Sequence, residues 1–308
     1  MKEELARQLT FAPIVRRALE AVPEHLVIGG MGGSALSGDA LAFLLPHRHT
    51  VVHRGYGLPA FTPSGALHIA VSYSGNTEET ISFANAALRQ GRRLAVVASG
   101  GTLADFAERE HLPLVLVPAG HQPRNALLSM TKALLVLAGE EEVAKRLEST
   151  VLDMERLTEE AEEDAHFILP SVPLIYASSH AAVLGRIGKI LLNETGRTPA
   201  FTNVFSELNH NEMQAFDTDM PEGLEHLFRF VVLIDGHDPR IVRRMETFRS
   251  VMEDRGRMVR MIDLSQHARE GMLIETWYRF AYAAQALAET RGIDPGTVPL
   301  IEAFKRLL

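Results

Sequence analysis

Short, uniformly apolar segments alternate with longer amphipathic segments along the first half of the chain. Each apolar segment has the length of a β-strand, and together they cover residues 25–30, 49–53, 67–72, 93–99 and 112–118. The intervening segments have the length and apolar spacing of α-helices, and they cover residues 34–45, 77–90, 102–110 and 125–137. Strands without a polar face that alternate with helices are typical of a parallel sheet covered on both sides. The first half is therefore predicted to be a doubly wound α/β domain.

The second half of the chain repeats this pattern. The segment PLIYASSHAAVLGRIGKILL (173–192) is similar to HLVIGGMGGSALSGDALAFLL (25–45), since both have the pattern of a strand, a turn of small residues and a helix. Residues 229–264 correspond in the same way to residues 69–99. An internal repeat of this kind indicates tandem copies of one structural unit. We therefore expect an α/β protein with two tandem doubly wound parallel-sheet domains.

The boundary between the two copies is expected near residue 150. Residues 140–165 are strongly charged with a heptad-like apolar stripe, which predicts one long helix between the halves. The expected domains are residues 1–150 and residues 151–308. The second contains an insertion, residues 193–216, that is rich in polar and ionisable side chains, and it ends in a C-terminal helix.

Charge and cysteine content exclude several classes of function. The net charge of -8 and the pI near 5.9 leave no broad basic surface, so neither nucleic acid nor a membrane is an expected partner. No apolar segment approaches the roughly 18 residues of a membrane-spanning helix, and the N-terminus is too polar for a signal peptide. The absence of cysteine excludes disulfides and thiolate metal sites. These features predict a cytoplasmic protein.

A cluster of hydroxyl side chains follows the apolar segment 67–72. Ser72, Ser74 and Thr77 surround Gly75 and precede a predicted helix. The carboxyl end of a parallel strand faces the ligand crevice, and the start of a helix presents unpaired N–H groups, so a phosphate fits there. For any single hydroxyl, helix capping is the alternative interpretation.

A second glycine-rich turn, GGMGGSALSGD (29–39), places Gly33 and Ser34 at the start of another predicted helix. A dinucleotide-binding fingerprint is the alternative here, but the turn lacks a clean G-x-G-x-x-G and no acidic residue ends the next strand. We favour two polar turns that converge on one phosphate.

Several motifs together resemble the sugar isomerase fold of the bifunctional phosphoglucose/phosphomannose isomerases. They are GMGGSALSGD, SYSGNTEET, QPRNAL (122–127), ELNHNE (207–212) and the C-terminal VPLIEAFKRLL. The resemblance spans nearly the whole chain and implies a small sugar phosphate as the ligand, without a cofactor or a metal. It places the phosphate on Gly33, Ser34, Ser72, Ser74 and Thr77.

The same resemblance implies four catalytic residues. Glu194 matches the base that moves the proton bound to carbon, a role that suits a carboxylate. Arg124 matches the arginine that faces the enediolate, where a permanent positive charge stabilises the developing oxyanion. His210 matches a ring-opening histidine that comes from the other subunit, which implies a homodimer with a shared active site. Lys305 matches a C-terminal lysine, an alternative acid for ring opening. Considered singly, each also fits a solvated side chain.

Two segments of the chain depart from the family pattern. Family members usually carry Asn-Ala-Lys after the glutamate, where this chain has Thr195, Gly196 and Arg197. Bifunctional members have a threonine where this chain has Val298.

The leading hypothesis is an aldose–ketose isomerase that interconverts glucose 6-phosphate with fructose 6-phosphate, with mannose 6-phosphate as a further candidate substrate. The alternative is a sugar-phosphate-binding regulatory protein, or a degenerate isomerase without efficient turnover, which the two departures favour. A transferase that moves ammonia onto fructose 6-phosphate is a third hypothesis, but the chain has neither an amidotransferase half nor a cysteine nucleophile.

Overall fold

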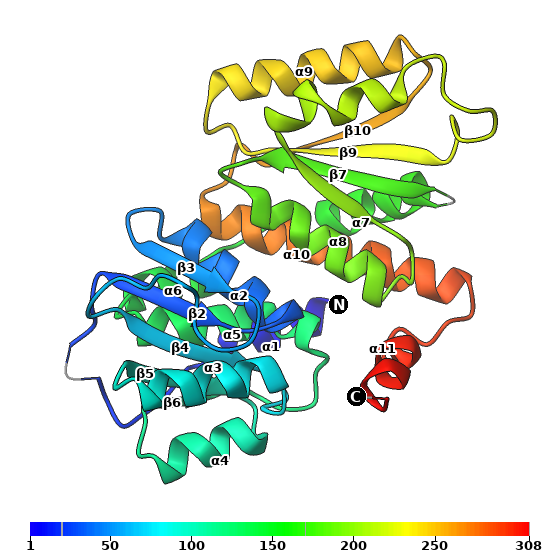
Figure 1. Cartoon of the computed structure of the whole chain (residues 1–308). Coiled ribbons are helices and arrows are strands. Elements are labelled where there is room, and N and C mark those ends of the chain that lie inside the picture. Colours follow the sequence, from blue (N-terminus) through cyan, green and yellow to red (C-terminus); the bar gives the residue numbers. More distant parts are fainter. Residues whose placement is uncertain (20, 170, 308) are drawn as a thin grey trace. The chain divides into compact units, whose positions relative to one another are not determined.

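The helices and strands of the chain group into two compact units. The computed structural model describes residues 1–19, 21–169 and 171–307 (Figure 1). The two units are Lys2–Thr150 and Val151–Leu308, called the first unit and the second unit below. Each contains its own sheet, and each is described by itself.

The sheet of the first unit has six strands, in the order β1-β6-β5-β4-β2-β3. The parallel strands are β2 (His25–Gly29), β3 (His49–His53), β4 (Leu67–Ser72), β5 (Arg93–Ala98) and β6 (Leu114–Leu116). From the adjacent strands β2 and β4 the chain winds outward in opposite directions, which confirms the predicted doubly wound pattern. The edge strand β1 (Val15–Arg16) is antiparallel to β6 and was not predicted, because two residues are too few to show a period.

Helices cover both faces of this sheet. On one face, Phe83 of α3 and Leu103 and Phe106 of α4 belong to the same buried cluster as side chains of β4 and β5. On the other face, α2 packs against α5, and α5 also contacts α1 and α6. All six residues of β4 are buried, which explains why this strand has no polar face. The helices are α1 (Lys2–Thr10), α2 (Gly32–Leu44), α3 (Glu78–Arg89), α4 (Gly101–Arg109), α5 (Leu127–Leu137) and α6 (Glu141–Ser149).

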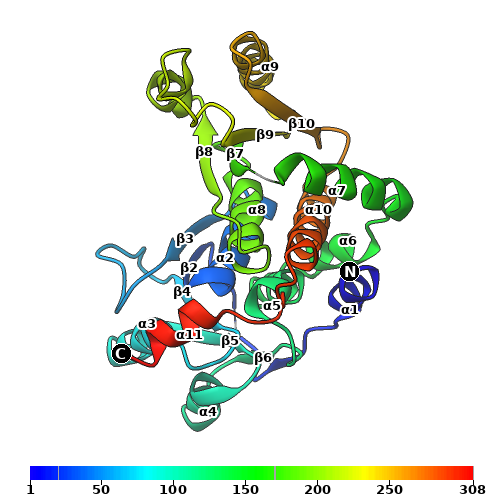
Figure 2. The same cartoon turned by 90° about the vertical axis from the view of Figure 1, so that its right-hand side faces the viewer.

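The sheet of the second unit has four strands, all parallel, in the order β10-β9-β7-β8 (Figure 2). They are β7 (Val172–Ser178), β8 (Phe201–Phe205), β9 (Phe228–Ile234) and β10 (Met258–Asp263). The strand order reverses between β7 and β9, as it does between β2 and β4 in the first unit. The predicted repeat of one α/β pattern is therefore confirmed.

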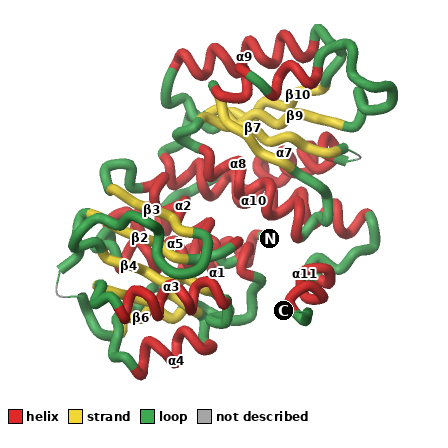
Figure 3. The backbone as a smooth tube through the Cα atoms, viewed as in Figure 1, coloured by secondary structure: helices red, strands yellow, loops and turns green. Residues whose placement is uncertain are grey.

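The helices of the second unit also lie on both sides of its strands (Figure 3). One layer contains α7 (Met154–Ile168), α8 (Ala182–Glu194) and α10 (Arg269–Thr290), with α10 packed against both others. The opposite face carries α9 (Pro239–Glu253) and the 3₁₀ segments η2 (Glu207–His210) and η3 (Glu212–Phe216), over an aromatic cluster. The chain ends in α11 (Pro299–Lys305), which has no buried residue.

The prediction of one long helix over residues 140–165 is wrong. The structure has two helices there, because α6 ends at Ser149 and α7 begins at Met154. The carboxylate of Asp153 accepts hydrogen bonds from the backbone N–H groups of Glu155 and Arg156, each at 3.1 Å, which is the geometry of an N-cap. The apolar stripe therefore continues across a helix boundary.

None of the helices in the described part of the chain has the length and apolar character needed to cross a membrane.

Candidate active site

The two polar turns that the sequence singled out lie side by side in the first unit. Strands β2 and β4 are parallel neighbours, so the turns that follow them share the carboxyl end of the sheet. A Cβ atom added at Gly30 would lie 2.8 Å from the carbonyl oxygen of Val71. The Ser34 hydroxyl accepts a hydrogen bond from the backbone N–H of Tyr73 at 3.0 Å. The structure therefore joins the Ser34 turn to the hydroxyl loop.

Inside the hydroxyl loop, Ser72 organises its neighbours. Ser72 is fully buried; its hydroxyl oxygen accepts a hydrogen bond from the N–H of Gly75 at 3.1 Å, and its O–H donates one to the Thr77 hydroxyl at 2.9 Å. Thr77 is the residue that precedes α3, but its side chain makes no capping bond, so the capping alternative is wrong for this residue. Ser74 is exposed, and its hydroxyl accepts from the N–H of Asn76 at 3.3 Å.

A third turn, residues 99–102, supports the loop from beyond β5. Gly75 has a φ of +71°, and a Cβ atom there would lie 1.8 Å from the carbonyl oxygen of Gly100, so only glycine fits. The side-chain oxygen of Asn76 accepts two hydrogen bonds from Thr102, from its N–H and its hydroxyl, each at 3.0 Å. Sequence reasoning missed Asn76 and Thr102, although the sequence Ser-Gly-Gly-Thr after a predicted strand was a signal.

Arg124 belongs to η1 (Pro123–Asn125), which follows β6 and packs against the start of α2. A Cβ atom at Gly33 would lie 2.9 Å from the backbone nitrogen of Arg124, so the close approach of the two segments requires glycine. The Arg124 side chain is only 1% exposed. An arginine stays charged when buried, so this segment brings a permanent positive charge into the first unit's interior.

Tyr73 holds the chain that leads to Arg124, and sequence reasoning missed this role. Its hydroxyl donates to the carbonyl oxygen of Pro118 at 2.9 Å and accepts from the N–H of His121 at 2.8 Å. Burial raises the pKa of the Tyr73 phenol, so it keeps its proton for the Pro118 bond.

These contacts gather Gly33, Ser34, Ser72, Ser74, Thr77 and the backbone of Arg124 at one edge of the first unit's sheet. The starts of α2 and α3 add backbone N–H groups that lack partners within their helices. Neutral hydroxyl and N–H donors around a glycine turn are suited to an anionic group such as a phosphate.

Glu194 is the last residue of α8 in the second unit and is half-buried. The turn after it is shaped by its neighbours, since the side-chain oxygen of Asn193 accepts from the N–H of Ala200 at 2.8 Å. A Cβ atom at Gly196 would lie 3.0 Å from the carbonyl oxygen of Leu192, so a larger residue there would require the backbone to shift by a few tenths of an ångström. The unusual Gly196 therefore matches the tight path of this turn.

Two further residues that differ from the family pattern, Arg197 and Val298, lie at and beside one hydrogen-bonded pair. The guanidinium group of Arg197 donates to the Thr297 hydroxyl at 2.7 Å. Thr297 directly precedes Val298, the residue before α11. Lys305 is exposed at the end of α11.

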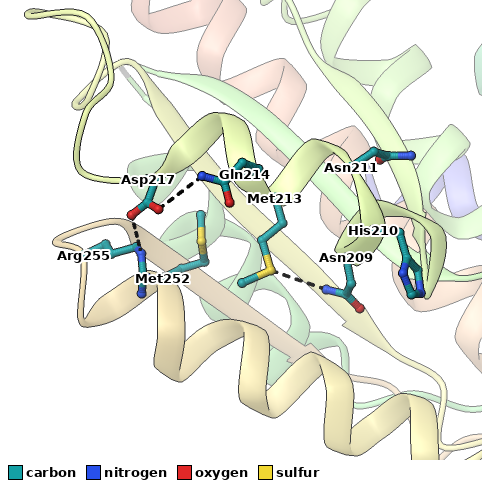
Figure 4. Close-up of a pocket in the computed structure, with 8 residues that line it drawn as sticks. All are labelled: Asn209, His210, Asn211, Met213, Gln214, Asp217, Met252 and Arg255. Carbon is teal, nitrogen blue, oxygen red and sulfur yellow. Dashed lines mark hydrogen bonds and ion pairs between the residues drawn. The ribbon is translucent and has the colours of Figure 1, made fainter.

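His210 is exposed at the end of η2 and lines a pocket of about 440 Å³ on the second unit (Figure 4). Figure 4 shows His210 at one end of this pocket and Asp217, paired with Arg255 at 2.9 Å, at the other. The described residues that line it are Asn209, His210, Asn211, Met213, Gln214, Asp217, Met252 and Arg255. Glu194 and Lys305 are not among them, so this pocket does not unite the three catalytic candidates of the second unit.

Glu212 attaches the His210 segment to the sheet. One carboxylate oxygen accepts a hydrogen bond from the Tyr176 hydroxyl on β7, and the other accepts from the Asn203 amide on β8. Burial and the Glu212 carboxylate raise the pKa of Tyr176, so the phenol remains a donor. Sequence reasoning treated the ELNHNE stretch as a unit and did not separate this anchoring carboxylate from the histidine.

The described residues contain no group of three or more His, Cys, Asp or Glu side chains arranged to hold a metal ion.

Comparisons with known proteins show which family the chain is similar to. Residues 157–308 match the family model of the bacterial phospho-glucose isomerase C-terminal SIS domain. A bifunctional phosphoglucose/phosphomannose isomerase of Caldicellulosiruptor bescii is 32% identical over 92% of this chain and 89% of its own length. One from Aquifex aeolicus is 30% identical over 92% of this chain and 90% of its own length.

A further relative matches only part of the chain, and a solved structure has a similar fold. A D-glucosamine-6-phosphate 4-epimerase of Sulfolobus acidocaldarius is 31% identical over 63% of this chain and 65% of its own length. The crystal structure of a hypothetical protein from Thermus thermophilus superposes with a TM-score of 0.71 at 20% identity, covering 99% of this chain and 86% of that one. The predicted tandem α/β fold is therefore confirmed.

Proposed function

The chain belongs to the family of bifunctional phosphoglucose/phosphomannose isomerases, and from this premise we propose that it interconverts glucose 6-phosphate and fructose 6-phosphate. Mannose 6-phosphate is the second aldose in the proposal, since it differs from glucose 6-phosphate only at C2. Membership of the sugar-phosphate isomerase family does not depend on which aldose is preferred.

The joined polar turns of the first unit are the observation that carries the proposal. Ser34 and Ser72 are buried and hold the backbone, whereas the exposed Ser74 and the half-buried Thr77 present hydroxyls at the loop. We assign the substrate phosphate to this loop and to the N–H groups at the starts of α2 and α3. Neutral donors can bind the phosphate group with few formal charges, which suits a site that must also release the phosphorylated product.

The proposed chemistry is a proton transfer between neighbouring carbons. After ring opening, the Glu194 carboxylate removes the proton from C2 of the aldose and an enediolate forms. The same carboxyl group returns the proton to C1 while the proton of the O2 hydroxyl moves to O1, which leaves the carbonyl at C2 and gives the ketose. Arg124 stabilises the negative oxygen of the enediolate, and a single donor of this kind often contributes about 3 kcal/mol.

Ring opening moves a proton to the ring oxygen, and we assign this step to His210 or Lys305. The histidine is exposed on the second unit, as expected for a side chain that serves the active site of a partner subunit. The proposed assembly is therefore a homodimer with shared active sites.

The test is a coupled spectrophotometric assay of the purified chain. Fructose 6-phosphate is supplied, and glucose 6-phosphate and mannose 6-phosphate are detected separately. Glucosamine 6-phosphate is included because one partly matching relative is a glucosamine-6-phosphate epimerase. Turnover between the hexose phosphates supports the proposal; binding of fructose 6-phosphate without any turnover would favour the sugar-phosphate-binding alternative.

A further inference from the structure

The turn after Glu194 is fastened to the end of α10. Arg291, the residue directly after α10, donates from one guanidinium nitrogen to the Thr198 hydroxyl at 2.9 Å and to the carbonyl oxygen of Gly196 at 3.2 Å. Arg197 between them has a φ of +43°, a left-handed conformation that is uncommon outside glycine. The backbone of this turn is therefore fixed in a specific path, and the path decides where the Arg197 side chain projects.

The Arg197 side chain connects this turn to the segment before α11. One guanidinium nitrogen lies 2.7 Å from the Thr297 hydroxyl oxygen, 3.2 Å from the Thr297 carbonyl oxygen and 3.4 Å from the Asp294 carbonyl oxygen. The segment that receives it is itself a closed turn, because the Asp294 carboxylate accepts from the N–H of Gly296 at 2.8 Å. A single side chain thus spans two loops that are 100 residues apart in sequence.

The side chains of α11 are largely exposed. No residue of α11 is buried, and the side chains of Leu300 and Phe304 are 83% and 63% exposed. The contacts of Arg197 with the segment before α11 therefore help to determine where this helix begins. Val298 follows Thr297 directly, and Lys305 lies two helical turns further along.

We propose that Arg197 is a positioning residue that holds Thr297 and so sets the place of Val298 and Lys305 relative to Glu194. This inference rests on the proposed function, in which Glu194 and Lys305 act on one substrate. Arg197 touches neither the substrate nor the reacting atoms in this proposal. It acts by keeping the turn after Glu194 and the segment before α11 in a fixed relative position, because small displacements of catalytic groups lower kcat.

The first test compares Arg197→Met, Arg197→Lys and Thr297→Val with the wild type. We expect Arg197→Met to lower kcat about tenfold and to change KM for fructose 6-phosphate by less than about twofold, because the proposed phosphate loop lies in the first unit. Arg197→Lys should recover part of the loss, since lysine keeps a donor but not the planar guanidinium. The kcat of the double variant Arg197→Met, Thr297→Val should be no lower than that of Arg197→Met alone, because both substitutions remove the same interaction.

Arg240→Met is the matched control. Arg240 is also an arginine of the second unit that hydrogen-bonds a neighbouring loop residue, Asp238, but its side chain is 86% exposed at the start of α9. This variant should keep wild-type kcat and KM. Fully additive effects of Arg197→Met and Thr297→Val, or an unchanged kcat in Arg197→Met, would overturn the proposal.

Amide hydrogen exchange supplies a readout that does not require activity. In Arg197→Met, the amides of residues 297–305 should exchange at least about threefold faster than in the wild type, while those of α9 stay unchanged. If the wild type shows no turnover, the proposed function fails, but the exchange experiment still tests the positioning. Unchanged exchange in residues 297–305 would overturn the inference even in an active enzyme.

Discussion

The Ser34 hydroxyl accepts a hydrogen bond from the backbone N–H of Tyr73 at 3.0 Å, across 39 residues of sequence. This bond joins the turn after β2 to the loop after β4, so the two candidate phosphate-binding segments form one structure. The Ser34 side chain is only 6% exposed, so this hydrogen bond lies in the interior of the unit and helps to hold the loop in place.

Replacing Ser72 and Thr77 together with alanine should weaken the binding of glucose 6-phosphate much more than that of glucose. The Ser72 hydroxyl holds both the Gly75 N–H and Thr77, so its loss removes bonds that shape the loop as well as donors to the ligand. The expected loss is roughly 1 to 3 kcal/mol. Titration calorimetry measures it, with Ser149→Ala, an exposed serine at the end of α6, as the control. Equal affinity of wild type and double variant for the phosphate ester would remove the loop from the binding site.

Glu194→Gln should lower turnover at least about a hundredfold with little change in substrate affinity, because glutamine keeps the shape but cannot accept the C2 proton. Steady-state kinetics and a binding titration together measure the two effects. Glu246→Gln is the control, since Glu246 is exposed on α9. Near-normal turnover in Glu194→Gln would assign the base to another carboxylate. Glu212 is a poor candidate, because both of its oxygens already accept hydrogen bonds from Tyr176 and Asn203.

Mixing Glu194→Gln subunits with His210→Ala subunits should recover part of the activity that each variant lacks alone. If the histidine serves the partner's active site, one of the two sites in a mixed dimer carries both intact residues. The assay follows activity after the two variants are unfolded and refolded together, and analytical ultracentrifugation measures the assembly. A monomer at assay concentration, or no recovery in mixed dimers, would contradict the shared site.

The free energy of unfolding should decrease as the pH falls below about 6.5, the ordinary pKa of histidine. His68 on β4 is fully buried, and burial lowers the pKa of its imidazole in the folded state. The unfolded chain then binds the proton more readily than the folded chain, so this stability is present above pH 6.5 and is lost with acidification. Urea denaturation at a series of pH values measures the slope, and His68→Leu should make it shallower. His166→Leu, which removes an exposed histidine of α7, is the control.

Val298→Thr should raise kcat/KM for mannose 6-phosphate relative to glucose 6-phosphate by about fivefold or more, because it restores the hydroxyl that the resemblance to the bifunctional isomerases links with the handling of the C2 epimers. The neighbouring Thr297 is not an easy substitute, since its hydroxyl already accepts from Arg197 at 2.7 Å. Both substrates are assayed with wild type and variant, and Val298→Ile is the control for side-chain volume. An unchanged ratio of the two kcat/KM values would mean that Val298 does not govern the choice of epimer.

Local sequence patterns were sufficient for most helices and strands. Strand β4 was predicted because a strand buried on both faces lacks a regular alternation of polar and apolar residues, and all six of its residues are buried. The hydroxyl loop was identifiable because polar and glycine residues interrupt an apolar pattern at one point. The same reasoning was wrong for residues 140–165, where the apolar stripe continues through the cap at Asp153.

The sequence by itself determined the tandem α/β architecture and the position of the hydroxyl loop, since both depend on residues close together along the chain. Only the tertiary structure decided that Asn76 binds Thr102, 26 residues away, and that Arg197 binds Thr297, 100 residues away. Hydrogen bonds of this kind depend on where the backbone folds back and on the direction of individual side chains. No period or motif records these two properties, because they are set by the packing of distant segments against each other.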